Sequence, residues 1–111
     1  MTDFNAALSA FIDSINNDGE EYFAKNYGNI EWDEVSAVGG NKYVKLAHAN
    51  RVYCFVAAVD VPNKNVKAGD ILMAASYKAP ALNRKRPAAG NIFDLASYES
   101  KDKAYGSWLY V

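Results

Sequence analysis

Four cationic side chains lie within nine consecutive residues of this chain, and they are the residues best suited to chemistry with an outside partner. They are Lys78, Arg84, Lys85 and Arg86, of which the last three are adjacent and lie between Pro80 and Pro87. Such a cluster can donate several charge-assisted hydrogen bonds to phosphates. Tyr77, directly before it, could stack on an unpaired base. We therefore predict that Tyr77 and the four cations form a nucleic-acid-binding site.

The distribution of charge along the chain leaves two interpretations of this cluster open. Residues 1–35 contain eight carboxylates and one cation, a net charge of −7, whereas the remaining residues contain eleven cations and five carboxylates, a net charge of +6. Separated charge of this size can attract a charged partner. Alternatively, the acidic and basic parts neutralise each other within one fold, and the basic loop is only solvated.

The acidic N-terminal third suggests a different partner. Its carboxylates could present a negative face to a basic protein, which would raise the rate of association. The residues concerned are Asp13, Asp18, Glu20, Glu21, Glu31, Asp33 and Glu34. An ordinary solvated helix face is the other interpretation of the same pattern.

The sequence offers little for nucleophilic catalysis, because it contains one histidine, His48, and one cysteine, Cys54. A two-residue turn at 49–50 would place His48 opposite Arg51 and Cys54 opposite Lys45. His48 and Cys54 would then point to opposite faces of a sheet. Cys54 also lies in an apolar run, which indicates a buried thiol. We predict that the protein is not an enzyme.

Metal and cofactor sites lack a good ligand set in the sequence. A single histidine and a single cysteine leave only carboxylates to complete a coordination sphere. Glu31, Asp33 and Glu34 could hold a hard cation weakly. The pair Gly39-Gly40 lacks the spacing of phosphate-binding loops, and no helix is expected directly after it. No metal and no cofactor are predicted.

The composition is that of one ordered domain over residues 1–111. Half of the residues are hydrophobic and 14% are aromatic, unlike the composition of disordered chains. The lone cysteine rules out an intrachain disulfide and favours a reducing compartment. No export signal or membrane-spanning apolar run is visible, so we expect a soluble, cytoplasmic protein.

Two N-terminal helices are predicted from the spacing of apolar residues. The first should run from about Asp3 to Asn16, with Thr2 as its N-cap. Residues 16–19, Asn-Asn-Asp-Gly, should end it. A second helix should cover residues 20–26 and stop before Gly28. The apolar stripe of the first helix consists of Phe4, Leu8, Phe11, Ile12 and Ile15.

After Gly28 the pattern changes to that of strands joined by turns. Gly39-Gly40-Asn41 is typical of a hairpin turn, and Ala49-Asn50 of a tight connection. Residues 78–103 should form an irregular loop with one helical turn near 93–98. The predicted strands are residues 32–38, 42–48, 51–60, 70–77 and 106–111.

Both faces of the strand predicted at 51–60 are apolar. One face should carry Tyr53, Phe55, Ala57 and Val59, and the other Val52, Cys54, Val56 and Ala58. A strand buried on only one side would alternate with polar residues, so this strand should be central. The helices should cover one face. Either the C-terminal segment or a second copy of the chain, in a homodimer, should cover the other.

Three short motifs follow one another in the second half of the chain. They are Val52-Tyr53-Cys54-Phe55, Ser76-Tyr77-Lys78-Ala79-Pro80-Ala81 and Gly90-Asn91-Ile92. Over residues 43–94 the chain resembles small uncharacterised proteins encoded by bacteriophages, with a VYCF strand before an SxKAPA segment and a GNI turn. The resemblance implies a phage protein in an infected bacterial cell and carries over no catalytic residue. By analogy it would act by binding nucleic acid, a host protein or a virion component.

Together these patterns predict an α+β fold in which two N-terminal helices pack on a mainly antiparallel sheet of about four or five strands. The predicted function is non-enzymatic binding of nucleic-acid phosphates through the basic loop. The alternative is a protein-interaction module that uses the acidic helices or an apolar sheet face.

Overall fold

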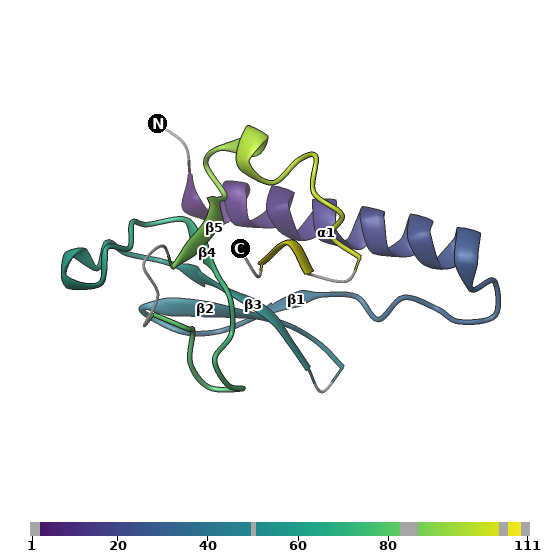
Figure 1. The fold of residues 1–111 in the computed structure, drawn as a ribbon, viewed down its shortest axis with the longest axis horizontal. Coiled ribbons are helices and arrows are strands. Elements are labelled where there is room, and N and C mark those ends of the chain that lie inside the picture. Colours follow the sequence, from purple (N-terminus) through teal and green to yellow (C-terminus); the bar gives the residue numbers. More distant parts are fainter. Residues whose placement is uncertain (1–2, 50, 83–86, 105–106, 110–111) are drawn as a thin grey trace.

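The computed structural model describes residues 3–49, 51–82, 87–104 and 107–109. One helix, α1 (Phe4–Asn26), lies across a five-stranded sheet (Figure 1). Neighbouring strands are all antiparallel, and they follow one another in the sheet as they do in the chain. The strands are β1 (Ser36–Val38), β2 (Tyr43–His48), β3 (Arg51–Ala57), β4 (Asp70–Leu72) and β5 (Ala88–Asn91). The predicted α+β class and antiparallel sheet are confirmed.

The prediction of two N-terminal helices is wrong, because α1 is one helix of 23 residues that continues through residues 16–19. Asn16 does not end the helix. Its side-chain Nδ2 donates to Val35 O at 3.0 Å, and its Oδ1 accepts from the Val35 N–H at 2.7 Å and from Trp32 Nε1 at 2.8 Å. Gly19 is buried, and a Cβ there would overlap the Trp32 ring. Asn16 and Gly19 therefore both contact the segment that follows the helix.

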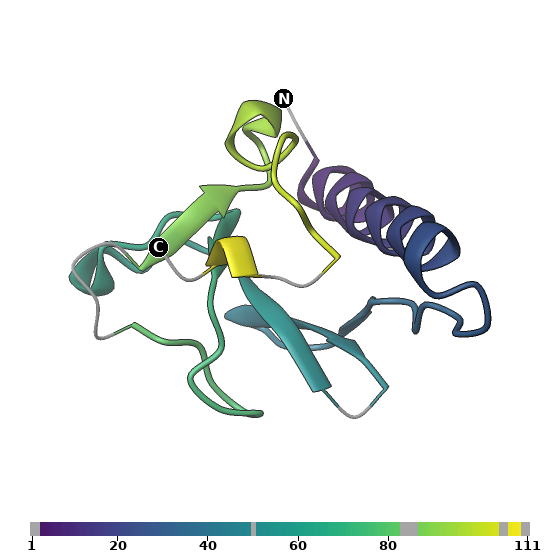
Figure 2. The same cartoon turned by 45° about the vertical axis from the view of Figure 1, so that its right-hand side comes forward.

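The two ends of α1 are set by local hydrogen bonds. At the N-terminus the carboxylate of Asp3 accepts from the Asn5 N–H at 3.1 Å, which satisfies one free backbone donor; the predicted cap, Thr2, lies outside the described residues. At the C-terminus the Tyr27 N–H donates to Phe23 O at 2.7 Å, so the helix ends before Gly28 as predicted. Figure 2 shows this end of α1 extending beyond the sheet.

Two turns and one irregularity fix the register of β1, β2 and β3. The β1–β2 hairpin contains Gly40 at φ +131°, where a Cβ would overlap the Tyr43 carbonyl oxygen, so only glycine fits. The next connection pairs His48 with Arg51, as predicted. Ala47 then pairs with Val52 and Leu46 with Cys54, which leaves Tyr53 as an extra residue in β3. This bulge reverses the side-chain alternation along the strand.

Buried residues form one cluster on each side of the sheet. The helix-side cluster holds fourteen buried residues from α1, the sheet and the C-terminal segment, with Phe11 and Tyr98 rings 4.8 Å apart. The far-side cluster holds five buried residues. These are Phe55, Ala57, Val61, Val66 and Leu72. The strand β3 contributes to both clusters and lies in the middle of the sheet, which confirms the prediction of a central strand.

The bulge corrects the predicted division of β3 into faces. Tyr53 joins Cys54 and Val56 in the helix-side cluster, whereas Val52 packs with Phe55 and Ala57 on the far side. The C-terminal segment, one predicted cover of the far face, lies on the helix side, where Leu109 is buried and Trp108 packs. Loop residues Val61, Val66, Ala74 and Leu82 cover the far face instead.

Several strand boundaries differ from the predictions. The strand predicted at 70–77 is paired as a strand only over Asp70–Leu72, and β5 lies in the region predicted to be irregular. The last strand, predicted at 106–111, is wrong over its described residues 107–109, which form a 3-10 turn. A predicted helical turn near 93–98 is present as a 3-10 turn over Leu95–Ser97.

Candidate functional site

The predicted basic site is only partly visible. Arg84, Lys85 and Arg86 lie outside the described residues, whereas Tyr77 and Lys78 lie within them. The described residues on either side of the basic run, Leu82 and Ala88, both pack against the far-side cluster. The chain therefore leaves and re-enters the described structure on the sheet face that points away from α1.

A tight excursion of the chain between β4 and β5 positions Tyr77 and Lys78. Backbone hydrogen bonds close its stem, from Ala75 N to Ala79 O at 3.0 Å and from Ala81 N to Met73 O at 2.8 Å. The Tyr77 side chain is 56% exposed at the tip of this excursion. Lys78, also exposed, follows it directly.

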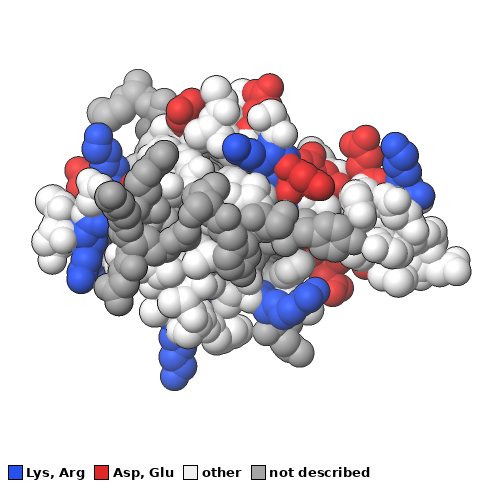
Figure 3. Space-filling model, viewed as in Figure 1, with Lys and Arg blue, Asp and Glu red and all other residues white. Residues whose placement is uncertain are grey.

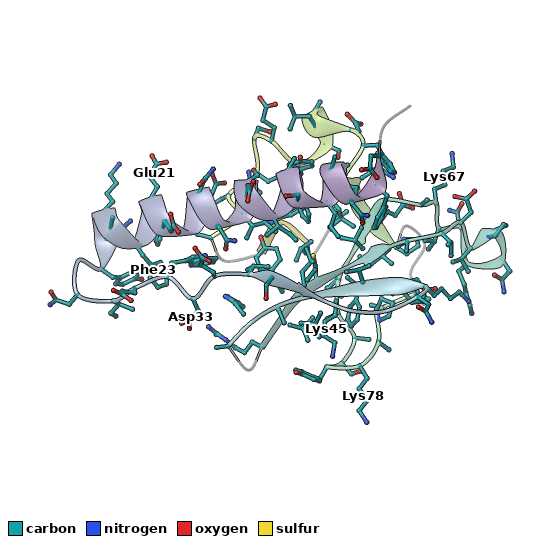
Figure 4. The ribbon with its side chains drawn as sticks, turned by 180° about the vertical axis from the view of Figure 1, so that it is seen from behind. Glu21, Phe23, Asp33, Lys45, Lys67 and Lys78 are labelled. Carbon is teal, nitrogen blue, oxygen red and sulfur yellow. The ribbon has the colours of Figure 1, made fainter. Side chains whose placement is uncertain are left out.

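Lys45 from β2 contacts Tyr77, and sequence reasoning missed this residue. Its Nζ lies 3.8 Å from the centroid of the Tyr77 ring, a cation–π contact that holds the two side chains together. Figure 4 shows Lys45 and Lys78 on the side of the sheet away from α1. The residues around Lys45 in the sequence gave no signal for this contact, because Tyr77 comes from a distant segment.

The segments that build the sheet contain almost no acid. Residues 35–59 and 71–93 include seven lysines and arginines and no aspartate or glutamate. Within the five strands the one carboxylate is Asp70, which is buried and accepts hydrogen bonds from the Lys67 N–H at 2.8 Å and Asn91 Nδ2 at 3.0 Å. Asp70 is therefore occupied within the fold.

Most carboxylates of the first third of the chain lie on α1 and on the segment that follows it. Four carboxylates of the first third, Asp13, Asp18, Glu20 and Glu21, lie on α1, and three more lie on the segment that leads from it to β1. Figure 3 shows most carboxylates of the visible face in its upper, helix-side half, together with several lysine or arginine side chains, and further lysine or arginine side chains along the lower, sheet-side edge. Among the described residues the structure contains one ion pair, between Lys103 Nζ and Asp18 at 2.9 Å.

Lys103 has a structural role in that pair. Its side chain is 1% exposed, and its Nζ also donates to the carbonyl oxygens of Tyr98, Glu99 and Lys101 at 3.1 to 3.3 Å. These contacts tie the turn at 98–101 to α1. They use one of the eight cations that the structure describes after residue 35.

The structure corrects the geometry predicted for His48 and Cys54. Because of the bulge, Lys45 pairs with Phe55 instead of Cys54. His48 lies on the helix side, with its ring 5.3 Å from Trp32, and Cys54 belongs to the helix-side cluster, so the prediction of opposite faces is wrong. Cys54 is nevertheless 0% exposed, so its thiol is not accessible from the surface. Burial also raises the pKa of the thiol, which keeps it protonated.

A pocket of about 270 Å³ opens where α1 projects beyond the β2–β3 turn. Four aromatic rings, Phe23, Trp32, His48 and Tyr53, form a continuous series along it. Arg51, Glu31 and Asp33 supply its charged groups, and Ile30 and Ala104 complete the lining. Sequence reasoning did not bring these residues together, because they come from five separate parts of the chain.

A second, wider groove of about 490 Å³ lies on the neighbouring surface at the end of α1. Its apolar lining includes Phe23, Trp32 and Ile30, of which Ile30 is 58% exposed. Three carboxylates, Glu20, Glu31 and Glu34, also line it, and none of the lining residues is cationic.

In the described part of the chain, no group of three or more histidine, cysteine, aspartate or glutamate side chains has the geometry to hold a metal ion. None of the helices described there is long and apolar enough to cross a membrane. Comparison of the sequence with protein-family models, with curated proteins and with solved structures gives no match.

Proposed function

We propose that this protein is a non-enzymatic nucleic-acid-binding protein that contacts phosphates through the far face of its sheet. The observation that supports the proposal best is the contact between Lys45 and Tyr77 on that face, with Lys78 next to Tyr77 in the chain, in segments free of carboxylates. Arg84, Lys85 and Arg86, predicted to belong to the same site, lie outside the described residues. The proposed setting is that implied by the resemblance to phage proteins, an infected bacterial cell.

The lysines and the tyrosine of this face offer different interactions to a nucleic acid. Ammonium groups without carboxylate neighbours keep their full attraction for phosphate, because no internal acid competes for them. An exposed tyrosine ring adds a surface on which an unpaired base can stack. The combination favours single-stranded over double-stranded nucleic acid, since bases in a duplex are already stacked.

The test is fluorescence anisotropy with labelled single- and double-stranded oligonucleotides across a salt series. We expect the Lys45→Ala/Lys78→Ala variant to lower the affinity for single strands and to reduce the salt slope by about 1 to 2. The Arg84→Ala/Lys85→Ala/Arg86→Ala variant should reduce the slope further.

A matched control removes the same charge elsewhere. The Lys25→Ala/Lys67→Ala variant loses two exposed lysines, one at the end of α1 and one before β4. If this variant and Lys45→Ala/Lys78→Ala weaken binding equally, the attraction depends on net charge and the proposed face is wrong. Absence of binding by the wild-type protein would also overturn the proposal.

A specific observation favours a second function, docking of a basic protein segment at the end of α1. The groove there combines an aromatic floor with Glu20, Glu31 and Glu34, a setting for a lysine or arginine side chain with its apolar stem. A synthetic lysine- and arginine-rich peptide serves as the probe. Glu20→Gln/Glu31→Gln/Glu34→Gln should weaken its binding more than Asp13→Asn/Asp94→Asn/Glu99→Gln, which removes three carboxylates outside the groove; equal weakening would exclude the groove.

A further inference from the structure

The pocket between α1 and the β2–β3 turn has walls that are already fixed in place. Trp32 is held by its hydrogen bond to Asn16 at 2.8 Å. The Tyr53 hydroxyl donates to Lys103 O at 2.7 Å and accepts from Trp108 Nε1 at 2.9 Å. A site whose side chains are already ordered loses less entropy when a ligand binds.

The aromatic side chains that line this pocket suit a flat ligand. The Phe23 and Trp32 centroids are 5.3 Å apart, Trp32 and His48 are 5.3 Å apart, and His48 and Tyr53 are 6.1 Å apart. Aromatic side chains placed in sequence offer several faces and edges against which a planar heterocycle can stack. An aliphatic ligand of equal size would gain only the burial of its surface.

The polar groups of the pocket offer both donors and acceptors. Arg51 presents guanidinium N–H groups, and Glu31 and Asp33 present carboxylate oxygens. Among the described residues no ion pair joins Arg51 to either acid, although all three line the same pocket. Neither carboxylate is paired with the guanidinium group, so both kinds of charge line the pocket and can contact a ligand.

His48 adds an acceptor of known identity. Its Nδ1 lies 3.2 Å from the carbonyl oxygen of Asp33, and a carbonyl can only accept, so Nδ1 carries the proton. In the neutral ring, Nε2 is then the acceptor. The pocket thus combines guanidinium donors, carboxylate and imidazole acceptors, and aromatic walls whose rings meet edge-to-face or tilted.

We infer that this pocket binds a nucleobase-like planar heterocycle whose edge carries both hydrogen-bond donors and acceptors. The inference deepens the proposed function and rests on it for one source of the ligand, an unpaired base of a bound single strand. His48 follows Lys45 by three residues of β2, about 10 Å along a strand, so a chain held by Lys45 could reach the pocket by passing around the β2–β3 turn. A free nucleoside is the other source of the same chemistry.

The test uses nucleosides, which have bases but no phosphate, and ribose 5-phosphate, which has phosphate but no base. Binding is followed by calorimetry and by the two tryptophan indole N–H signals in a nitrogen-correlated NMR spectrum. Nucleosides should shift the Trp32 signal more than the Trp108 signal, because only Trp32 lines the pocket. Ribose 5-phosphate should shift neither. The Trp32→Phe variant assigns the two signals.

Variants of Arg51 test the edge contacts. Arg51→Lys keeps the charge but loses the planar fork, and should lower nucleoside affinity by about fivefold or more. Lys64→Ala removes an exposed cation elsewhere and should leave that affinity unchanged. Equal affinities in wild type, Arg51→Lys and Arg51→Ala would overturn the inference, as would the absence of any Trp32 shift with nucleosides.

Oligonucleotides with and without a base separate this inference from the proposed function. If an abasic strand binds as tightly as a normal one, with normal salt dependence, the proposed function stands and the pocket inference fails. If nucleosides bind but no oligonucleotide does, the pocket inference stands for free nucleosides and the proposed function fails. A normal strand that binds more tightly than the abasic one, with the difference lost in Arg51→Lys, supports both.

Discussion

The two faces of the sheet differ in how they are covered and in the charge of their cover. On the helix side, α1 and the C-terminal segment enclose a cluster of fourteen buried residues, and the cover is acidic. On the far side, loops cover five buried residues, and the described charged groups near Tyr77 are lysines. Stabilisation by burial is roughly proportional to apolar area, so the helix side contributes most of the stability.

This difference implies that the two faces respond differently to substitution. Residues that join α1 to the rest of the protein are buried and hydrogen-bonded, so their loss should cost stability. Residues on the exposed tip of the far face make few contacts, so their loss should leave the fold intact. A binding function located there can be removed without unfolding the protein.

The largest loss of stability is expected from Lys103→Met. It leaves three carbonyl oxygens without their donor and should lower the free energy of unfolding by about 2 to 4 kcal/mol. Asp18→Asn removes the ion pair alone and should cost less than about 1 kcal/mol, because Asp18 is 38% exposed. Urea denaturation measures both. Equal losses would show that the ion pair, and not the carbonyl contacts, holds the 98–101 turn.

Asn16→Ala should follow, with a loss of about 2 to 3 kcal/mol. The change removes an acceptor from two N–H groups and a donor from one carbonyl in a partly buried setting. Asn17→Ala, an exposed neighbour on the same helix, should change stability by less than about 0.5 kcal/mol. Similar values for the two asparagines would contradict the proposed anchoring of the 32–35 segment.

Gly19→Ala tests the close approach of Trp32 to α1. Alanine favours a helix over glycine by about 1 kcal/mol, but its Cβ would overlap the indole ring. We expect a net loss of about 1 to 3 kcal/mol from this overlap. Gly28→Ala meets no atom within 4 Å and should be close to neutral. A stabilised Gly19→Ala variant would mean that Trp32 can move away at little cost.

Alkaline pH should weaken the helix-side core by a smaller amount. Burial raises the pKa of both Cys54 and Tyr53, so the folded protein keeps two protons that the unfolded chain releases above about pH 9 and pH 10. Stability therefore falls with rising pH, by about 1 to 2 kcal/mol between pH 9 and pH 10. Urea denaturation across this range measures the slope. Cys54→Val should make it shallower, and an unchanged slope would assign it to other groups.

The smallest change in stability is expected on the far face. Tyr77→Ala should cost less than about 1 kcal/mol, because it removes an exposed ring and one cation–π contact. Under the proposed function it should still lower single-strand affinity in the anisotropy assay, by roughly fivefold or more. A large loss of stability would place Tyr77 in the structural core, against this comparison of the faces.

The sequence predicted the parts of the fold that depend on local patterns. Alternation and turn residues located β2, β3 and their connection, and the apolar run 51–57 showed that β3 is central. Local patterns gave wrong predictions where contacts with residues distant in the sequence determine the structure. Asn16 and Gly19 look like the end of a helix, but their role is set by Trp32 and Val35, more than twelve residues further along the chain.

The candidate site was predictable to a similar degree. The cluster of basic residues in the sequence pointed to Lys78 and to its neighbour Tyr77. Lys45, which contacts Tyr77, was missed because the two residues are 32 positions apart in the sequence. The pocket at Trp32 depends on the bulge at Tyr53, which shifts the alternation of β3 by one residue. A bulge of this kind has no reliable signal in a strand where residues on both faces are apolar.

The arrangement of the acidic helix α1 on one side of a carboxylate-poor sheet also gives the molecule an electric dipole directed from one layer to the other. In the field of a polyanion such a body experiences a torque as well as an attraction. It would turn its strands toward the polymer before touching it and keep α1 directed outward. Encounters would then begin in a productive orientation, and added salt would slow them by weakening both effects.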